Sequence, residues 1–487
     1  MNRRYLIPGA ILACLLQACA SPVRTTELHR IDQFSGYRYS TLERQAPKAI
    51  DSTAVLVTFS GGGTRAAALA DGALRALAET MVRGKDGMAP LSSQIDIVSS
   101  VSGGSVTAAY YALGGIGGLD DLERDFLYKD VMGELITKVV LNPFQLFSPR
   151  IDILDNYLDE HLFHHKTYRD LLAANHPGND RRPYVVLNAG DMASGSVFSF
   201  NQDQFDLICA DLAEFKIADA VSASAAFPVA LSALTIKNRA PCEAQRKAAA
   251  EDISGWQAEN GQPEPKRIVA DRSTAESLGV RYPDADNLAR FRRGTVALDY
   301  LNRDRKEDFI QLLDGGIADN LGLTLPLTLL TSPNESPSFL NWANTGKADK
   351  LLLLVVNARG EAGNDFGARA SPPGIADMLL TSIATPIDAT SFQLLGKLDL
   401  LADSRLNPQA LVLVDFDLIS DNGCRTRFHE MATSWTLAQR DVDDLIALGK
   451  AMVLQSPRYK DIVTALGGVV PSANPSVEQI CAKTEGR

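Results

Sequence analysis

The stretch Val98–Ser105, with the sequence VSSVSGGS, constrains the fold of this chain more than any other. It follows a short apolar run, Ile95–Val98, and precedes small residues at helical spacing. A strand that turns sharply into a helix, with a serine at the corner and glycines after it, has the build of a nucleophile elbow. Ser102 is the corner residue, and we expect its hydroxyl near the N-terminal amides of the helix. Gly103 and Gly104 supply the small neighbours that such a corner needs.

Ser100 departs from the usual G-x-S-x-G pattern, because it stands in the place of the first glycine. A serine adopts extended or bridge backbone conformations without strain, but not a positive φ. Taken alone, the stretch is therefore open to a second interpretation, an ordinary polar turn.

A second glycine-rich corner precedes the first. The apolar run Ala54–Phe59 predicts a buried strand, and it leads into Ser60–Arg65, with the sequence SGGGTR. Gly61, Gly62 and Gly63 allow backbone amides to point into a site, which suits an oxyanion. A plain turn or a phosphate loop is the alternative, although no G-K-[ST] or G-x-G-x-x-G completes a phosphate motif.

A third strand end carries a carboxylate. The apolar run Phe309–Leu313 stops at Asp314, followed by Gly315 and Gly316. In open α/β sheets the chemistry gathers at the C-terminal ends of strands, where we expect Asp314 to lie. By itself the motif is equally typical of a turn.

These three motifs, in this order, resemble those of the patatin-like phospholipase family. The likeness extends to Asn320 and Leu321 after the acid, and to Ala220–Pro228, which is similar to the family's A-x-x-A-S-x-A-x-P run. The resemblance implies an α/β fold of three layers, α/β/α, with a mainly parallel central sheet.

The resemblance also implies roles for residues. Ser102 matches the family's nucleophile and Asp314 the acid of a Ser-Asp dyad. The oxyanion segment is matched by Gly61, Gly62, Gly63 and Arg65, the elbow by Ser100, Gly103 and Gly104, and the acid motif by Gly315 and Gly316. Arg65 either orients the loop or meets a lipid phosphate.

The activity so implied is hydrolysis of lipid acyl esters, of phospholipase A or lysophospholipase type, with phospholipid or another lipid ester as substrate and no metal or cofactor. Two alternatives stay open. One is an inactive envelope lipoprotein that keeps the fold to bind lipid or a partner, and the other is a general carboxylesterase or thioesterase.

The first residues, 1–18, have the pattern of a signal peptide. Arg3 and Arg4 form the positive end, and Leu6–Leu16 forms an apolar core of 11 residues, too short to span a bilayer. Cys19 resembles the acylated first residue of a bacterial lipoprotein, with simple secretion as the alternative.

The residue after Cys19 is Ala20 and not aspartate, which resembles the sorting signal of outer-membrane lipoproteins in Gram-negative bacteria. The protein would then face the periplasm or the cell surface. Residues 19–50 are polar and predict a tether. We expect one α/β hydrolase domain over 51–467, with a polar insertion at about 239–305 that is either decoration or a lid, and a loose tail over 468–487.

The net charge of −11, which becomes −13 without Arg3 and Arg4, argues against a nucleic-acid partner. Contact with a membrane should therefore rest on the lipid anchor and on apolar surface. The apolar run 131–147 fits either ordinary core or an acyl-chain tunnel.

Outside the signal and the anchor the chain has four cysteines, which allow three pairings. We favour Cys209 with Cys242 and Cys424 with Cys481, because near pairs close smaller loops; four free thiols are the alternative. The histidines suggest no metal site, since His161–His165 lacks the H-E-x-x-H order. A triad that uses His429 stays open.

Overall fold

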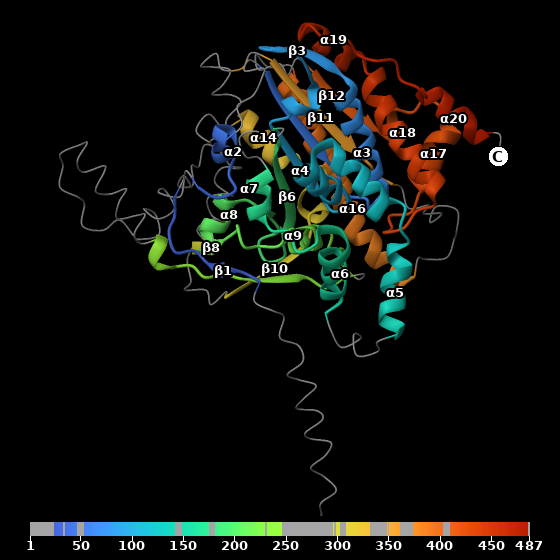
Figure 1. Ribbon diagram of the computed structural model, residues 1–487. Coiled ribbons are helices and arrows are strands. Elements are labelled where there is room, and N and C mark those ends of the chain that lie inside the picture. The colour runs from blue at the N-terminus through green and yellow to red at the C-terminus, as the bar shows by residue number, and fades with distance from the viewer. Residues whose placement is uncertain are drawn as a thin grey trace, which may run out of the picture.

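A sheet of eight strands forms the centre of the computed structural model (Figure 1). In sheet order the strands are β12 (Ala410–Asp415), β11 (Lys350–Asn357), β2 (Thr53–Phe59), β5 (Ile97–Val101), β6 (Tyr184–Asp191), β10 (Phe309–Asp314) and β9 (Leu234–Lys237), with β7 (Val197–Ser199) paired to β6. The first five strands run parallel, whereas β10 is antiparallel to both β6 and β9. The prediction of a mainly parallel sheet in an α/β fold is confirmed.

The structure describes residues 24–32, 35–45, 53–141, 149–174, 181–228, 231–245, 296, 299–301, 308–331, 348, 350–360, 374–402 and 410–485. Most of the predicted insertion, and residues 142–147 of the apolar run, lie outside this part of the chain.

The central strands β2 and β11 form where the sequence is mostly apolar, whereas β5 also contains Ser99 and Ser100. Every residue of β2 and β5 is buried, as is β11 after Lys350. Strands buried on both faces need such runs, because helices cover each side of a parallel sheet. Residues of β10 alternate between buried and more exposed positions, as befits its place nearer the edge.

Helices cover both faces of the sheet (Figure 1). From β2 through β5 to β6 the chain moves in one direction, so right-handed crossovers place α3 (Gly63–Glu79) and α4 (Gly103–Leu122) on the same face. The connection from β11 to β12 moves the opposite way and places α16 (Ile375–Ala402) on the other face. The result is the expected α/β/α arrangement.

The α3 layer is completed by α18 (Gln439–Gln455), which crosses α3 at two glycines. A Cβ on Gly72 would lie 1.9 Å from the Ile446 carbonyl oxygen, and one on Gly449 would lie 2.2 Å from that of Leu69. Only glycines allow the two backbones to approach this closely.

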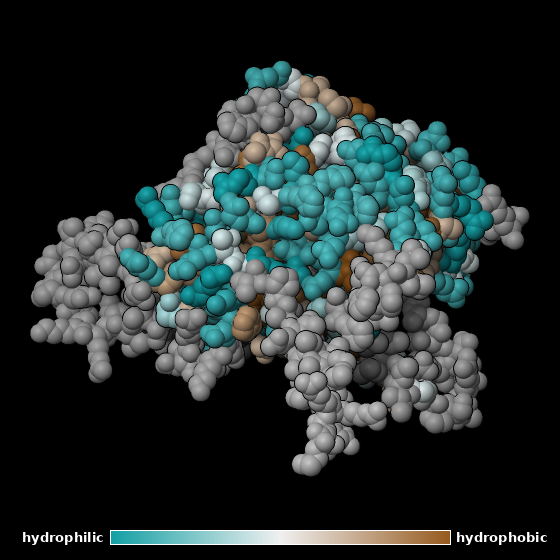
Figure 2. Space-filling model, turned by 60° about the horizontal axis from the view of Figure 1, so that its bottom comes forward, coloured by the Kyte–Doolittle hydropathy of each residue, from teal (hydrophilic) through white to brown (hydrophobic). Residues whose placement is uncertain are grey.

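The remaining elements surround these layers. They are β1 (Thr26–Glu27), β3 (Met81–Gly84), β4 (Gly87–Pro90), β8 (Ala210–Asp211), α2 (Tyr39–Gln45), α5 (Val131–Leu141), α6 (Arg150–Leu158), α7 (Tyr168–Ala174), α8 (Gln202–Leu207), α9 (Ile217–Ser224), α13 (Gly316–Asp319), α14 (Thr324–Thr331), α17 (Asn422–Glu430), α19 (Pro457–Ala465) and α20 (Val477–Glu485). Within the described ranges no helix is both long and apolar enough to cross a membrane. The described surface in Figure 2 is mostly hydrophilic, with hydrophobic residues scattered among polar ones.

Both favoured disulfides are confirmed. Cys209 bonds to Cys242, and Cys424 bonds to Cys481. The second bond joins α17 to α20, so the prediction of a loose tail after residue 467 is wrong: this segment contains a helix that also packs on α18.

The prediction of a tether over residues 19–50 is wrong for the described part of that segment. Arg24 is buried, β1 pairs with β8, and Arg38 forms ion pairs with Asp203 and Asp206. Polar composition misled the prediction because these charges are paired inside the fold rather than solvated.

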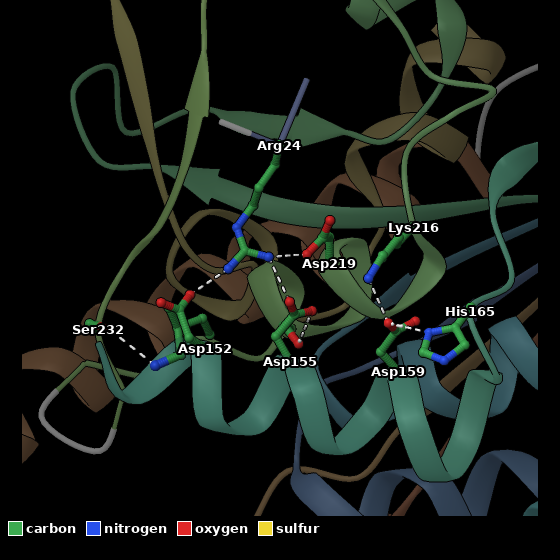
Figure 3. Close-up of polar contacts among 10 residues, drawn as sticks. Arg24, Asp152, Asp155, Asp159, His165, Lys216, Asp219 and Ser232 are labelled. Atoms are coloured by element: carbon green, nitrogen blue, oxygen red, sulfur yellow. Dashed lines mark hydrogen bonds and ion pairs between the residues drawn. The ribbon is translucent and has the colours of Figure 1, made fainter. Parts of the chain in front are cut away.

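Arg24 joins the N-terminal segment to two helices (Figure 3). Its side chain is only 6% exposed, and its guanidinium contacts Asp152 and Asp155 of α6 and Asp219 of α9. The distance from Nη1 to the Asp155 Oδ2 is 2.6 Å. Burial raises the pKa of Asp219 well above its usual range, and the neighbouring Asp155 carboxylate raises it further. One cation thus contacts three acidic side chains and links the N-terminal segment to α6 and α9.

We expect Arg24→Met to lower the free energy of unfolding by about 3–5 kcal/mol at neutral pH, because it leaves buried carboxylates without their cation. A carboxyl whose pKa is raised by folding binds its proton more readily in the folded state, so this deficit should shrink as the pH falls. Urea unfolding at several pH values measures both effects. Arg169→Met, which breaks the exposed pair with Glu214, is the control and should lower the free energy of unfolding by less than about 1 kcal/mol. Equal losses for both variants at every pH would contradict a stabilising role of the Arg24 ion pairs.

Candidate active site

Ser102 lies at the corner between β5 and α4, where the strand ends at Val101 and the helix begins at Gly103. Its backbone has φ 50° and ψ −125°, in a region that residues with a Cβ rarely adopt. Such conformations cost about 1–3 kcal/mol and persist only where the surroundings hold them. The side chain is 9% exposed. The corner therefore has the strained geometry that the elbow interpretation requires.

The glycines after Ser102 let the corner pack against the preceding glycine loop. A Cβ on Gly103 would lie 2.0 Å from the Gly63 carbonyl oxygen, and one on Gly104 would lie 2.7 Å from that of Ser60. Ser100 belongs to β5 and is not among the described residues with positive φ. A serine in place of the first glycine is thus compatible with this elbow.

The sheet register brings Asp314 to the same level as the corner. In the pairing of β5 with β6, Val101 lies opposite Asn188, and in the pairing of β10 with β6, Asp314 lies opposite Ala189. Ser102 and Asp314 therefore flank β6 at nearly the same height. Because β10 is antiparallel to β6, the acid reaches this level from the opposite direction, which the expectation of a parallel strand end had not anticipated.

Asp314 is buried, with 6% of its surface exposed. Its carboxylate accepts a hydrogen bond from the Gly316 amide, at 2.8 Å, and the Ser102 side chain is near enough to influence its pKa. Burial raises the pKa of Asp314 to about 6, while the Gly316 amide and the Ser102 side chain act in the opposite direction. The structure thus places the two residues of the expected dyad near one another across β6, and burial makes the carboxylate a stronger base than an exposed aspartate.

The glycine loop lies beside the serine. A Cβ on Gly61 would be 3.3 Å from the Ser102 Cβ. The Gly61 amide already donates to the Asn320 carbonyl, at 3.1 Å, so the structure removes it from the expected oxyanion donors. Gly62 and Gly63 have φ values of 143° and 58°, which require glycine, and their amides have no acceptor in the described part of the chain.

Arg65 does not belong to the oxyanion donors. Its side chain is buried, and its nitrogens donate to the carbonyls of Ala358 and Met431 and to the hydroxyl of Thr433. Burial lowers the pKa of Arg65 to about 10. Of the two interpretations of this residue, the structure favours the one in which it fixes the loop. The oxyanion prediction for Arg65 is therefore corrected.

Two histidines of the described part of the chain form hydrogen bonds with carboxylates other than Asp314. His429 contacts Asp417, at 2.9 Å, and His165 contacts Asp159, at 2.7 Å. Within the described ranges no group of His, Cys, Asp and Glu side chains could hold a metal ion. Asp314 lies near a hydroxyl and an amide, so the arrangement favours a two-residue dyad over a triad.

Sequence reasoning did not single out Ser224, whose hydroxyl accepts a hydrogen bond from the Ser102 amide at 2.8 Å. Its only sequence signal was its place in the segment Ala220–Pro228, which carried the family resemblance. Chemically, the site combines a hydroxyl, a carboxylate that can accept its proton, and two backbone amides that can stabilise an anion.

Comparison with known proteins found a family model and solved structures that are similar to this chain. Residues 57–249 match a family model described as "Patatin-like phospholipase". This range includes the glycine loop, Ser102 and Ser224, and it ends before Asp314. The solved structure of the human GIVD cytosolic phospholipase A2 is similar over 92% of this chain and 68% of that chain, with 12% sequence identity and a TM-score of 0.44. No curated protein matches this sequence.

The strained corner predicts an unusual order of stability. Ser102→Gly and Ser102→Ala both remove the hydroxyl, but only glycine relieves the positive φ, so the glycine variant should be the more stable by about 1–2 kcal/mol. At Ser382, an exposed residue of α16, alanine should instead be the more stable by about 0.5–1 kcal/mol. Denaturant unfolding of the four variants measures this. An alanine variant as stable as the glycine variant at position 102 would show that the corner is unstrained.

Proposed function

We propose that this chain cleaves lipid acyl esters with a Ser102–Asp314 dyad, because residues 57–249 match the model of the patatin-like phospholipase family, whose members are lipid acyl hydrolases. Phospholipase A or lysophospholipase activity is the proposed reaction. The placement of Ser102 and the buried Asp314 at one level on either side of β6 is the observation that supports it most.

In the proposed mechanism, Asp314 accepts the proton of the Ser102 hydroxyl while the oxygen attacks the ester carbonyl carbon. The amides of Gly62 and Gly63 stabilise the oxyanion, and the N-terminus of α4 favours negative charge at the corner. When the bond to the leaving alcohol breaks, Asp314 returns the proton to that oxygen. Water then attacks the acyl-enzyme by the same route, which releases the fatty acid and restores the hydroxyl.

The raised pKa of Asp314 suits a proposed mechanism in which the base is a carboxylate and not a histidine. A base with a pKa of about 6 is largely ionised at neutral pH and is still a better proton acceptor than an ordinary aspartate. Burial also excludes water from the proton that is transferred.

The alternative of an inactive fold that only binds lipid drew its support from Ser100. The ordinary backbone conformation of Ser100 in β5 removes that support. A general carboxylesterase or thioesterase would use the same dyad, and a panel of acyl donors distinguishes it from a phospholipase.

We expect Ser102→Ala and Asp314→Asn each to lower kcat for a short-chain nitrophenyl ester by at least about 10³-fold while the fold is retained. In the wild type, kcat/KM should fall as the pH drops through about 6, because Asp314 must be ionised to accept the proton. Steady-state kinetics between pH 4.5 and 9 and release of fatty acid from phospholipid, followed by mass spectrometry, measure both. Full activity in either variant would exclude the dyad.

The proposed location is the outer membrane of a Gram-negative bacterium, with acylated Cys19 as the anchor. Arg24 is fixed to the domain and follows Cys19 by five residues. A chain of that length spans at most about 18 Å, so the acylated protein would be held directly at the bilayer surface.

Cys19→Ser should move the protein from the membrane fraction of producing cells to the soluble fraction, because it removes the acyl acceptor. The Ser102→Ala variant, whose anchor is intact, is the matched control and should stay with the membranes. Membrane retention of the Cys19 variant would contradict the lipid anchor.

A further inference from the structure

The backbone amide of Ser102 is satisfied by a side chain from another element. Ser224, the last residue of α9, places its Oγ 2.8 Å from the Ser102 nitrogen. Ser224 is completely buried. A buried amide without a partner costs free energy, and at a strained corner nothing in regular secondary structure would supply one. The Ser224 hydroxyl meets that need.

The direction of each hydrogen bond around Ser224 follows from its single proton. The Ser224 Oγ donates to the Asn188 carbonyl, at 2.6 Å, so it can only accept from its other neighbours. The Ser105 hydroxyl, at 2.9 Å, must therefore be a donor to Ser224. The Ser100 hydroxyl lies 3.1 Å from that of Ser105 and 3.4 Å from the Val186 carbonyl, and the shorter separation favours donation to Ser105. The hydroxyls of these three serines form a buried series of hydrogen bonds beneath the corner, in which each hydroxyl donates to the next: Ser100 to Ser105, Ser105 to Ser224, and Ser224 to the Asn188 carbonyl.

The same residue reaches the other half of the dyad through its backbone. The Ser224 carbonyl accepts from the Gly315 amide, at 3.0 Å, and the Ala226 carbonyl accepts from the Asp314 amide, also at 3.0 Å. The end of α9 and the residues just after it thus bind the Ser102 amide with a side chain, and the amides of Asp314 and Gly315 with one carbonyl each. A bond from the Ser224 hydroxyl to Asn188 ties this end to β6, which lies between Ser102 and Asp314.

We infer that Ser224 is a positioning residue, which sets the separation and orientation of Ser102 relative to Asp314 and is itself held by Ser105 and Ser100. The inference rests on the proposed function of that pair. Ser224 does not react with substrate; it acts through the Ser102 amide.

Positioning of a reacting pair affects turnover more than binding, because small displacements lower the rate of the chemical step. We therefore expect Ser224→Ala to lower kcat for a nitrophenyl ester about 10- to 100-fold, with KM within about twofold of the wild type. Ser105→Ala should lower kcat less, since Ser224 keeps its bond to Ser102. The double variant should lose no more than Ser224→Ala alone, because both act through one contact.

Ser222→Ala is the matched control. Ser222 lies on the same helix, is equally buried, and contacts Asp155 at 3.4 Å rather than the corner. It should retain the wild-type kcat. Thermal unfolding of each variant establishes that kinetics are measured on folded protein, and if Ser224→Ala does not fold, the Ser105→Ala variant decides by its drop in kcat at unchanged KM.

Three results would overturn the inference: wild-type kcat in folded Ser224→Ala, an equal loss in Ser222→Ala, or a loss that appears in KM alone. Each presumes an active wild type. A wild-type chain that hydrolyses no acyl ester overturns the proposed function itself, which keeps the two failures distinguishable.

Discussion

The pairing of β6 with β5 on one side and with β10 on the other is the constraint on which the site depends. Strands in a sheet are about 4.8 Å apart, and their registers are fixed by hydrogen bonds along their length. With Val101 opposite Asn188 and Asp314 opposite Ala189, the corner and the acid arrive at one level. A slip of one residue in either pairing would reverse the side-chain directions and separate the pair.

Burial then gives this pair its proposed chemistry, and it does so at a cost in stability. Removing the Asp314 carboxylate from water raises its pKa to about 6, and the positive φ of Ser102 keeps the corner strained. The fold offsets these costs through contacts that do not take part in the proposed reaction. Glycine backbones pack together at the elbow, Arg65 ties the glycine loop to neighbouring segments, and α9 links both halves of the dyad.

The features that were predicted correctly from the sequence are those that depend mainly on residues near one another in the chain. Continuous apolar runs indicated β2, β11 and β12, and cysteine spacing favoured the two disulfides that the structure contains. The motifs indicated Ser102 and Asp314, which the fold brings near one another, although their roles remain predictions.

What the sequence did not reveal depends on contacts between distant segments. The antiparallel direction of β10 is set by its pairing with β6 and β9, and no residue within β10 specifies it. Polar composition concealed the burial of Arg24, because its three aspartates lie more than a hundred residues away. The commitment of the Gly61 amide to Asn320 and the hydrogen bonds of Arg65 likewise required the folded chain.

The central claim is that one serine of this chain is activated by one buried carboxylate. Reaction of the full chain with a fluorophosphonate, followed by intact-mass measurement and peptide mapping, tests it most directly, because only an activated serine forms the adduct at an appreciable rate. The account predicts a single adduct, on Ser102, whose rate of formation falls below a pH of about 6 as Asp314 becomes protonated. An unmodified Ser102 or an adduct on a different serine would contradict it.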